Sequence, residues 1–293
     1  MIHLRASDDL VEQLAERLSV CEGVRVERLS DKADYPVLMP RDDWKPIDQE
    51  TLGKFIRGGA RRVRGNCIGL MSIPEYAHAP ILSFLEWYFE GGPKDVEQCS
   101  REEHRLDVLR QIYDAPECPR TSTRPIFFGV ARNTPDASCA TIDREIDSLV
   151  GLHIDNFDNL PSSQRMRGRN RISANVGTES RYFIFMPHEA AEMASLILAS
   201  SGQEDAERLE WDQRELVWRF FELFPRTPIY RVEVRPGEAY MAPTENIMHE
   251  GSTLGTTADD WSIVWFGEFD WDRLRFRQEP DDGDASLRLR RQA

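Results

Sequence analysis

The sequence predicts an α+β fold in which a helical N-terminal layer packs on a β-rich core. Helical spacing dominates residues 1–118, and short strand-like runs separated by polar turns dominate residues 119–276. Two helical patterns interrupt the second part as an insert over residues 188–224. Short strands with turns between them are typical of a barrel or a sandwich. Residues 277–293 are charged and predicted to form a flexible tail.

The N-terminal layer is predicted to consist mainly of helices. Residues 7–20 begin with a serine that can cap a helix, and their leucines recur at helical spacing. Residues 47–56 form a second helical pattern, which ends before a Gly-Gly pair. The other predicted elements are a strand at 64–71, an aromatic-rich helix at 74–89 and a charged helix at 95–113.

The core is predicted from seven strand-like runs and two helices. The strands are expected at residues 125–131, 148–153, 171–176, 181–185, 229–234, 239–242 and 262–269. The helices of the insert are expected at residues 189–199 and 206–224. No internal repeat or low-complexity linker divides the chain, so one domain carrying the helical layer is the simplest organisation.

Charge and composition limit the classes of partner that are expected for the protein. The 293 residues include 37 Lys and Arg against 51 Asp and Glu, which gives a net charge of -14 and a pI of about 5.0. Such a surface repels a phosphate backbone, so no nucleic-acid partner is expected. No apolar run approaches the roughly 18 residues of a membrane span, so no membrane partner is expected. The N-terminus lacks a signal-peptide pattern, and the five dispersed cysteines are interpreted as reduced thiols. A cytoplasmic protein is predicted.

Two of the six histidines stand in a pattern that suits a metal. The other four are interpreted as surface or capping residues: His3, His78, His104 and His188. His153 ends an apolar run and Asp155 follows it at i+2, so their side chains share one face of a strand. His249 follows a turn, a strand and a loop over residues 236–243. A third ligand on a separate strand would complete the 2-His-1-carboxylate set of non-haem iron oxygenases.

Residues 125–270 resemble the Fe(II)/2-oxoglutarate-dependent oxygenase superfamily. The resemblance rests on GLHID at 151–155, the pair RISANVG and RYFIFMP, the passage RPGEAYMAPTENIMHEGS at 235–252 and the strand WSIVWFGEF. It implies a double-stranded β-helix, a jelly-roll or cupin-like core. It also implies that His153, Asp155 and His249 are the catalytic metal ligands of Fe(II), with 2-oxoglutarate as co-substrate and O2 as oxidant. RYFIFMP is most similar to the JmjC and asparaginyl-hydroxylase branch.

One position departs from the pattern of that superfamily. Many members bind the distal carboxylate of 2-oxoglutarate with an Arg-x-Ser motif shortly after the second histidine. Here Ser262 stands in the place of the serine, but Asp260 stands in the place of the arginine. A carboxylate cannot bind a carboxylate favourably, so the basic residue must come from elsewhere.

Two arginines are candidates for binding the co-substrate. The JmjC-like branch takes its basic residue from the fourth core strand, which corresponds to Arg181 here; a surface charge on a strand is the alternative interpretation of Arg181. Arg171 is the second candidate, because it shares strand parity with Ser173 and Asn175 and all three can face the interior. Asn175 and Ser262 complete the predicted co-substrate site.

The resemblance implies a hydroxylase. Related halogenases have a small residue in place of Asp155, so its presence favours hydroxylation. A small-molecule substrate, such as an amino acid or a natural-product intermediate, is expected; a peptide or protein side chain and a non-catalytic cupin-like binding protein are the alternatives. A zinc hydrolase is disfavoured, because His249-Glu250 lacks the second histidine of an H-E-x-x-H motif.

The loop after the first two ligands is either a lid or a solvated segment. Residues 159–170 contain Arg165, Arg167 and Arg169, which suit an anionic substrate group if the loop is a lid. Asn156 and Asp158 are expected either to orient Asp155 and contact substrate or to cap a turn.

Overall fold

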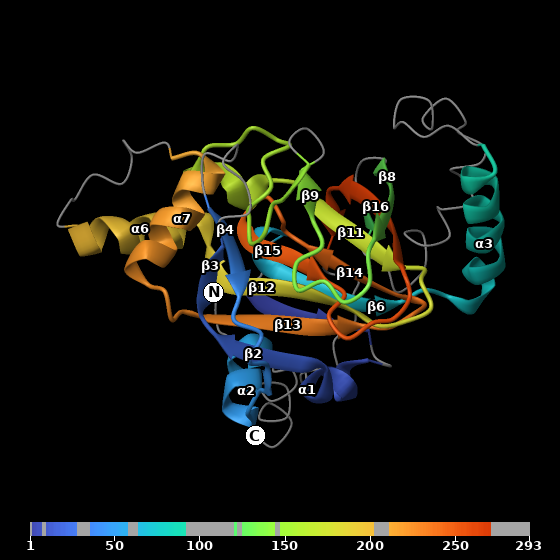
Figure 1. Ribbon diagram of the computed structural model, residues 1–293, viewed down its shortest axis with the longest axis horizontal. Helices are drawn as coiled ribbons and strands as arrows, with labels where there is room; N and C mark the ends of the chain where they lie inside the picture. The colour runs from blue at the N-terminus through green and yellow to red at the C-terminus, as the bar shows by residue number, and fades with distance from the viewer. Residues whose placement is uncertain are drawn as a thin grey trace, which may run out of the picture.

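Two β-sheets form the centre of the molecule (Figure 1). The computed structural model describes residues 2–7, 10–27, 36–57, 64–91, 120–121, 125–143, 147–201 and 211–270. The six-stranded sheet contains, in spatial order, β1 (His3–Ala6), β6 (Cys67–Ser72), β14 (Glu238–Ala242), β11 (Asn170–Asn175), β16 (Asp260–Gly267) and β8 (Ile126–Asn133). The five-stranded sheet contains β15 (Ile247–Ser252), β12 (Arg181–Glu189), β13 (Pro228–Val234), β2 (Leu18–Glu22) and β5 (Lys45–Pro46).

The remaining elements are short strand pairs and helices. The pairs are β3 (Val24–Glu27) with β4 (Val37–Pro40), β9 (Ile142–Asp143) with β10 (Ser148–Leu149), and β7 (Arg120–Thr121) with β17 (Phe269–Asp270). The α-helices are α1 (Leu14–Arg17), α2 (Gln49–Arg57), α3 (Glu75–Phe89), α6 (Ala190–Ser201) and α7 (Gln213–Leu223). The 3-10 helices are η1 (Val11–Gln13), η2 (Arg64–Asn66) and η3 (Ser162–Arg167).

The alternation of side chains along the strands packs the two sheets face to face. On β12, Phe183 and Phe185 point into the space between the sheets, whereas Ile184 and Met186 point outward. The ring of Phe183 stacks on that of Tyr240 in the opposite sheet, with centroids 4.2 Å apart. The face of β12 that carries Phe183 also carries Arg181, because alternate residues share a face.

The space between the sheets has two halves. Its apolar half lies between β1, β6 and β14 on one side and β12, β13 and β2 on the other, and it is filled by residues such as Leu4, Leu70, Phe185, Val232 and Val234. Its polar half lies between β11, β16 and β8 on one side and β15 with the start of β12 on the other. Buried residues of this half include Asp155, Asn175, Arg181, His249 and Asp260.

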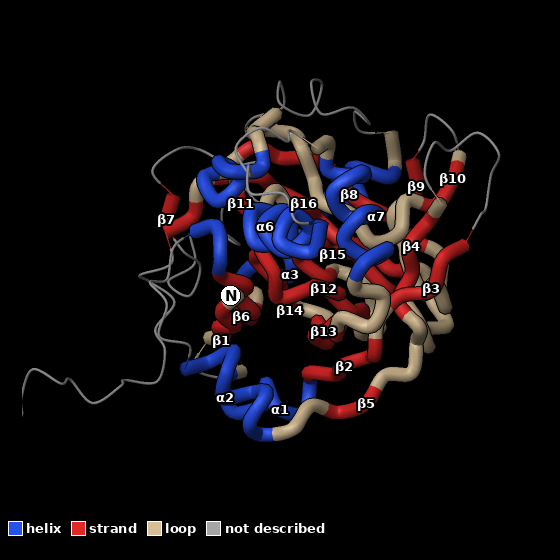
Figure 2. Tube along the Cα trace, turned by 90° about the vertical axis from the view of Figure 1, so that its left-hand side faces the viewer, coloured by secondary structure: helices blue, strands red, loops and turns tan. Residues whose placement is uncertain are grey.

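Helices cover the outer faces of both sheets. Helix α3 packs on the six-stranded sheet through Ala77, Ile81 and Phe84, and it stands at the right of Figure 1. Helices α6 and α7 cover the five-stranded sheet and lie in front of it in Figure 2. Helix α7 begins at Gln213 because the Asp212 side chain accepts hydrogen bonds from the amides of Arg214 and Glu215. None of the helices in the described ranges is long and apolar enough to cross a membrane.

The β-rich core with helices is confirmed, but several elements differ from their predictions. The strand predicted at 64–71 begins only at Cys67, because Arg64–Asn66 is η2, and residues 247–252 form β15, which was not predicted. The predicted helix at 7–20 is wrong over its last three residues, because Leu18–Glu22 is strand β2, paired with β13. The predicted strand at 148–153 is regular only over Ser148–Leu149, although His153 forms an isolated bridge with His249. The residues before 118 thus supply β1, β6, β2 and β5 to the two main sheets. The helix at 95–113 and the tail at 277–293 lie outside the described residues, and the division into layer, core and tail stays a prediction.

Candidate metal centre

Three separate backbone anchors bring the predicted metal ligands together. His153 and His249 exchange backbone hydrogen bonds across their bridge, at N···O distances of 3.1 and 2.8 Å. The amide of Asp155 donates to the carbonyl of Thr244 at 3.0 Å. The segment of Asp155 is therefore attached to the turn that leads into β15, the strand of His249. These anchors fix the three side chains although residues 150–155 form no continuous strand.

The three side chains converge on one point. One ligand atom from each of His153, Asp155 and His249 lies within 4.8 Å of the others. The Nε2 atom of His153 is 3.6 Å from Oδ1 of Asp155, and the Nε2 atom of His249 is 3.7 Å from Oδ2. Asp155 and His249 are buried, and His153 is half-buried. Among the described residues, this is the one group of three or more potential ligands at such distances.

Backbone carbonyls orient both imidazole rings. Nδ1 of His153 lies 2.7 Å from the carbonyl oxygen of Gly151, and Nδ1 of His249 lies 3.2 Å from that of Ile247. Because a carbonyl only accepts, Nδ1 carries the proton in each ring and Nε2 faces Asp155. Gly151 has φ of +72°, and a Cβ there would lie 2.5 Å from the carbonyl oxygen of Leu38. Glycine is therefore required at the position that orients His153.

The charges of the site are strongly coupled. Burial alone would lower the pKa of His153, but the carboxylates of Asp155 and Glu250 outweigh it and raise this pKa to about 10. Burial also opposes the ionised form of Asp155, but Arg171 and both histidines hold the pKa of that carboxyl well below its usual range. Burial lowers the pKa of His249 to about 3. The metal-free site thus contains a protonated His153, an ionised Asp155 and a neutral His249.

Arg171 completes the surroundings of Asp155. Its Nη2 atom lies 2.8 Å from Oδ2 of Asp155, and its guanidinium lies over the ring of Phe266, 5.2 Å from the centroid. Arg171 is in register with Phe266 on the neighbouring strand β16. The structure therefore places this predicted co-substrate residue in direct contact with a predicted metal ligand.

Glu250 is a site residue that the sequence did not indicate. Its side chain is fully buried, and its Oε2 atom is 3.6 Å from Nδ1 of His153. Its Oε1 atom accepts hydrogen bonds from the amides of Thr141 and Gly251 and from the hydroxyl of Thr141. Glu250 directly follows His249, so its side chain points to the opposite face of β15 from that of His249. It reaches His153 because His153 lies beside β15, and that pairing is the signal that could have revealed Glu250.

The loop after Asp155 is pinned by buried polar side chains. Nη1 of Arg165 donates to the carbonyl oxygens of Asp155, at 2.7 Å, and Glu245, at 3.2 Å, while Nη2 donates to Asn156 Oδ1 at 3.0 Å. Asp158 accepts from the amide and Nε of Arg169, both at 2.7 Å. Arg165 is only 3% exposed. Arg165 is therefore not a solvated residue, and it holds the loop after Asp155 in place.

Arg181 also faces the polar half and pairs with Asp260. Its Nη1 atom is 3.2 Å from Oδ2 of Asp260, and both side chains are buried. Asp260 also accepts from Asn133 Nδ2 at 2.7 Å. A Cβ on Gly251 would lie 2.8 Å from Nη2 of Arg181, so glycine makes room for the guanidinium two residues from His249. The interpretation of Arg181 as a surface charge is wrong.

The two polar residues predicted for the co-substrate site are buried. Nδ2 of Asn175 donates to the carbonyls of Glu179 and Val234, at 3.0 and 2.9 Å, and its Oδ1 accepts from the amide of Gly177 at 3.0 Å. These bonds use all its hydrogen-bonding groups to hold the turn between β11 and β12. Ser262 is buried opposite Asn175 on β16.

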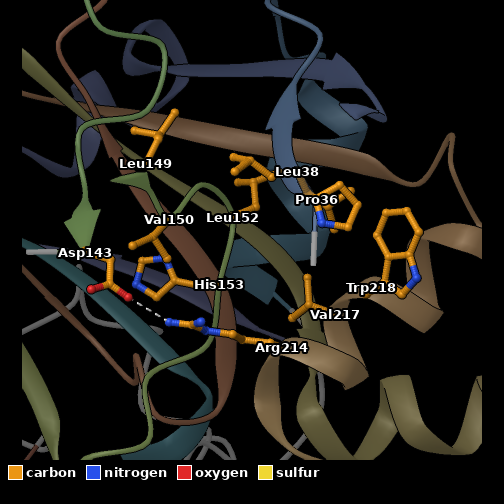
Figure 3. Close-up of a pocket in the computed structure, with 11 residues that line it drawn as sticks. Pro36, Leu38, Asp143, Leu149, Val150, Leu152, His153, Arg214, Val217 and Trp218 are labelled. Atoms are coloured by element: carbon orange, nitrogen blue, oxygen red, sulfur yellow. Dashed lines mark hydrogen bonds and ion pairs between the residues drawn. The ribbon is translucent and has the colours of Figure 1, made fainter. Parts of the chain in front are cut away.

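A cavity of about 60 Å³ lies beside His153 (Figure 3). Its apolar lining comes from β4, the segment before His153 and α7, and comprises Pro36, Val37, Leu38, Leu149, Val150, Leu152, Val217 and Trp218. Asp143 and Arg214 form an ion pair at 3.1 Å on its wall. His153 is the one ligand of the three that lines this cavity.

The donor set suits a first-row transition metal. Two neutral imidazole nitrogens and one carboxylate on the same side of an ion are the facial arrangement of non-haem iron sites. Within the described part of the chain, His249 Nε2 is buried without a hydrogen-bond partner. Buried polar atoms of this kind are costly unless a ligand satisfies them, so the residues fit a bound metal ion.

Comparisons with known proteins give weak structural similarities. No protein-family model matches the sequence, and no curated protein matches it. The structure is similar to that of the Kdo hydroxylase KdoO, a non-heme Fe(II) alphaketoglutarate dependent dioxygenase, in complex with cobalt(II), with 13% identity over 78% of this chain and 86% of that chain and a TM-score of 0.37. The complex of KdoO with alphaketoglutarate and Fe(III) gives 14% identity, the same coverage and the same TM-score.

A second neighbour is the iron and alpha-ketoglutarate-dependent endoperoxidase NvfI, with 8% identity over 87% of this chain and 99% of that chain and a TM-score of 0.30. TM-scores below 0.5 are too low to establish fold or function, so the assignment depends on the geometry of the chain's own residues.

Proposed function

We propose that the chain is a mononuclear non-haem iron(II) oxygenase that uses 2-oxoglutarate as co-substrate and hydroxylates a small molecule. The observation that carries the proposal is the convergence of His153, Asp155 and His249, with both Nε2 atoms oriented by backbone carbonyls. His153, Asp155 and His249 would hold the metal. Fe(II) would supply the redox chemistry and the open positions at which the co-substrate and O2 react.

We infer that the core is a double-stranded β-helix. Along the chain, β8 belongs to the six-stranded sheet, the His153 bridge joins β15, and β11 returns to the six-stranded sheet. Strands β12 and β13 then lie in the five-stranded sheet, followed by β14, β15 and β16 on alternating sides. This alternation between two facing sheets is the strand order of that fold and supports residues 119–276 as the catalytic core.

Within the proposed site, Arg181 is the residue that binds the distal carboxylate of 2-oxoglutarate. Its Nε atom is buried without a hydrogen-bond partner among the described residues, and its Nη1 atom is paired with Asp260. Its guanidinium lies beside Gly251, two residues from His249 along β15. Two residues of a strand span roughly 7 Å, which is comparable with the length of a five-carbon dicarboxylate. The location of Arg181 on the fourth core strand supports the JmjC and asparaginyl-hydroxylase-like branch.

Arg171 and Glu250 have supporting roles in this proposal. Arg171 keeps Asp155 ionised and fixes the position of Oδ2, from which a metal can be bound. Glu250 lies against Nδ1 of His153, and a carboxylate behind a ligating imidazole makes the ring a stronger donor. Ser262 lies on the same strand as Asp260 and stays a proposed contact of the co-substrate, whereas the amide of Asn175 is already used by the backbone.

The first test is an anaerobic titration of the metal-free protein with Fe(II) and 2-oxoglutarate. Chelation of Fe(II) by the keto acid gives a weak visible charge-transfer band, which we expect in the wild type and not in His153→Ala. Arg181→Ala is expected to weaken 2-oxoglutarate binding more than tenfold, by roughly the 1.5–3 kcal/mol of a charged hydrogen bond. Arg171→Ala is the comparison: a larger loss there would move the carboxylate-binding role to Arg171.

Other outcomes favour other functions. Iron binding without the band would favour an iron enzyme that does not use 2-oxoglutarate. A metal content near zero after reconstitution would favour a non-catalytic cupin-like binding protein. Turnover of a peptide in place of a small molecule would favour the alternative of a side-chain hydroxylase.

A further inference from the structure

Three phenylalanine rings form a cluster next to the metal centre. Phe128 lies on β8, Phe266 on β16, and Phe157 two residues after Asp155. The centroid of Phe266 is 5.0 Å from those of Phe128 and Phe157, which are 5.3 Å from each other. Phe266 is buried, but Phe128 is 40% and Phe157 is 47% exposed. Two rings of the cluster therefore present apolar surface to solvent on top of the third.

The cluster faces the polar half of the space between the sheets. Phe127 and Trp265 belong to the outer cluster that packs on α3, so their neighbours Phe128 and Phe266 point to the opposite face. That face also carries Arg171, the register partner of Phe266. In the apolar half the five-stranded sheet covers this face completely. At Phe128 and Phe157 the same face of the six-stranded sheet and the adjoining ligand loop stay accessible.

The backbone at Phe157 is held by hydrogen bonds to a buried carboxylate. Its amide donates to Glu245 Oε1 at 2.8 Å, and the next amide, of Asp158, donates to Glu245 Oε2 at 3.3 Å. Glu245 is itself buried, and Arg165 ties its carbonyl oxygen to that of Asp155. The metal ligand Asp155 and the exposed ring of Phe157 therefore lie on one pinned segment. A ring held in this way loses little conformational entropy when a ligand packs on it.

The charges around the cluster are already neutralised. Arg171 and Arg169 lie over Phe266, 5.2 and 5.8 Å from its centroid. Arg171 pairs with Asp155 at 2.8 Å, and Arg169 pairs with Asp158 at 2.6 Å. Neither guanidinium therefore offers an unpaired charge to an anion. The accessible part of the cluster consists of the Phe128 and Phe157 rings, which favour an apolar aromatic group over a sugar or an acid.

We propose that Phe128 and Phe157, supported by Phe266 beneath them, form a platform against which an uncharged aromatic group of the substrate packs. This inference rests on the proposed function, because Arg171 connects the platform to a residue that would hold the metal. It narrows the expected small molecule to one with an aromatic ring near the carbon that reacts. Phe128 and Phe157 are then residues that determine specificity.

The test uses indole as an uncharged aromatic probe and myo-inositol as a polar probe without an aromatic ring. Saturation-transfer NMR with the metal-free protein measures binding to the platform. Paramagnetic broadening of the probe by Mn(II) bound to the protein measures whether the probe lies near the metal. We expect indole, and not inositol, to give both signals. Phe157→Ala and Phe128→Ala should each weaken indole binding by roughly fivefold, while Phe157→Leu should retain part of it.

Phe89→Ala is the matched control, because Phe89 is also 47% exposed but lies on α3 at the outer face of the six-stranded sheet. It should leave indole binding unchanged. Equal binding by all variants, or equal binding of inositol, would overturn the platform. Indole that binds without broadening, in protein shown by titration to hold Mn(II), would also overturn it. Failure to hold Mn(II) would refute the proposed function instead, and saturation transfer would still decide whether the platform binds indole.

Discussion

The apolar and polar halves of the space between the sheets differ in whether their buried side chains find all their contacts within the protein. In the apolar half, residues such as Leu70, Phe185 and Val234 pack against one another from both sheets. In the polar half, Arg181 Nε and His249 Nε2 are buried without a hydrogen-bond partner in the described part of the chain. An unsatisfied buried polar group costs about 1–3 kcal/mol. One half therefore stabilises the fold, and the other keeps polar atoms available for ligands at a cost in stability.

The largest expected effect is on metal binding in the polar half. His249→Ala should reduce Co(II) affinity by more than about 100-fold. Loss of a residue that hydrogen-bonds a metal ligand typically lowers metal affinity by about 10–100-fold, and loss of the ligand itself should lower it further. The free energy of unfolding of the metal-free protein should hardly fall, because the substitution also removes an unsatisfied buried nitrogen. Titration calorimetry with Co(II), followed by urea unfolding, measures both quantities.

The control for this change is His188→Ala, which alters a histidine that pairs with Glu192 on the outer side of the five-stranded sheet. It should leave Co(II) affinity unchanged. Equal affinity of the wild type and His249→Ala would remove the metal centre from this site.

The next effect concerns the apolar half. Leu70→Ala on β6 should lower the free energy of unfolding by about 2–5 kcal/mol, because it leaves a cavity between the two sheets. Metal affinity in the folded protein should be retained. Urea denaturation measures the stability, and Leu82→Ala at an exposed position of α3 should cost less than about 0.5 kcal/mol. A small cost for Leu70→Ala would mean that the N-terminal strands are not integral to the core.

This contrast also explains which features could be predicted from the sequence. The structure brings His153, Asp155 and His249 together, as the sequence predicts. An H-x-D pattern alone is common by chance, so this prediction depended on the resemblance of the surrounding passages at 151–155 and 235–252. The participation of β2 in the core was missed, because Leu14 and Leu18 fit helical spacing although only Leu14 is in a helix. Apolar spacing over a few residues does not distinguish a helix from a strand. Pairing with the distant strand β13 determines that Leu18–Glu22 is a strand.

The partners of the site residues could not be predicted for a similar reason. Glu250, Arg165 and Glu245 act through contacts between segments distant in sequence, such as the bond from Arg165 to the carbonyl of Glu245. Asp260 was recognised as a departure, but its pairing with Arg181 depends on two strands from different sheets. No local pattern in the sequence specifies that distance.

The pH dependence of metal binding should be of intermediate size. A metal and a proton compete for Nε2 of His153, whose pKa is raised to about 10, whereas His249 with a pKa of about 3 is already neutral. Binding at neutral pH therefore releases about one proton, and Co(II) affinity should rise by up to about tenfold per pH unit as the pH rises toward 10. Calorimetry from about pH 6.5 to about pH 8.5, in buffers with different ionisation enthalpies, measures this release.

Glu250→Gln sharpens this prediction, because it removes one of the two carboxylates that raise the pKa of His153 while retaining the shape of the side chain. The rise of affinity with pH should become shallower and should level off at lower pH in this variant. An affinity that does not change with pH in the wild type would show that His153 is already neutral before the metal binds.

The smallest expected effect concerns the ion pair between Arg181 and Asp260. Asp260→Asn removes the anion that competes with a carboxylate of 2-oxoglutarate, so the affinity for 2-oxoglutarate should rise by roughly threefold to tenfold. Without co-substrate, the melting temperature should fall, because Arg181 loses its buried counter-ion. Added 2-oxoglutarate should then raise the melting temperature more than in the wild type.

Asp259→Asn, at the neighbouring pair with Arg132 near the surface, should change neither quantity. If Asp260→Asn weakened 2-oxoglutarate binding, Asp260 would position Arg181 for the co-substrate instead of competing with it, and the departure from the Arg-x-Ser pattern would be a supporting contact of the site.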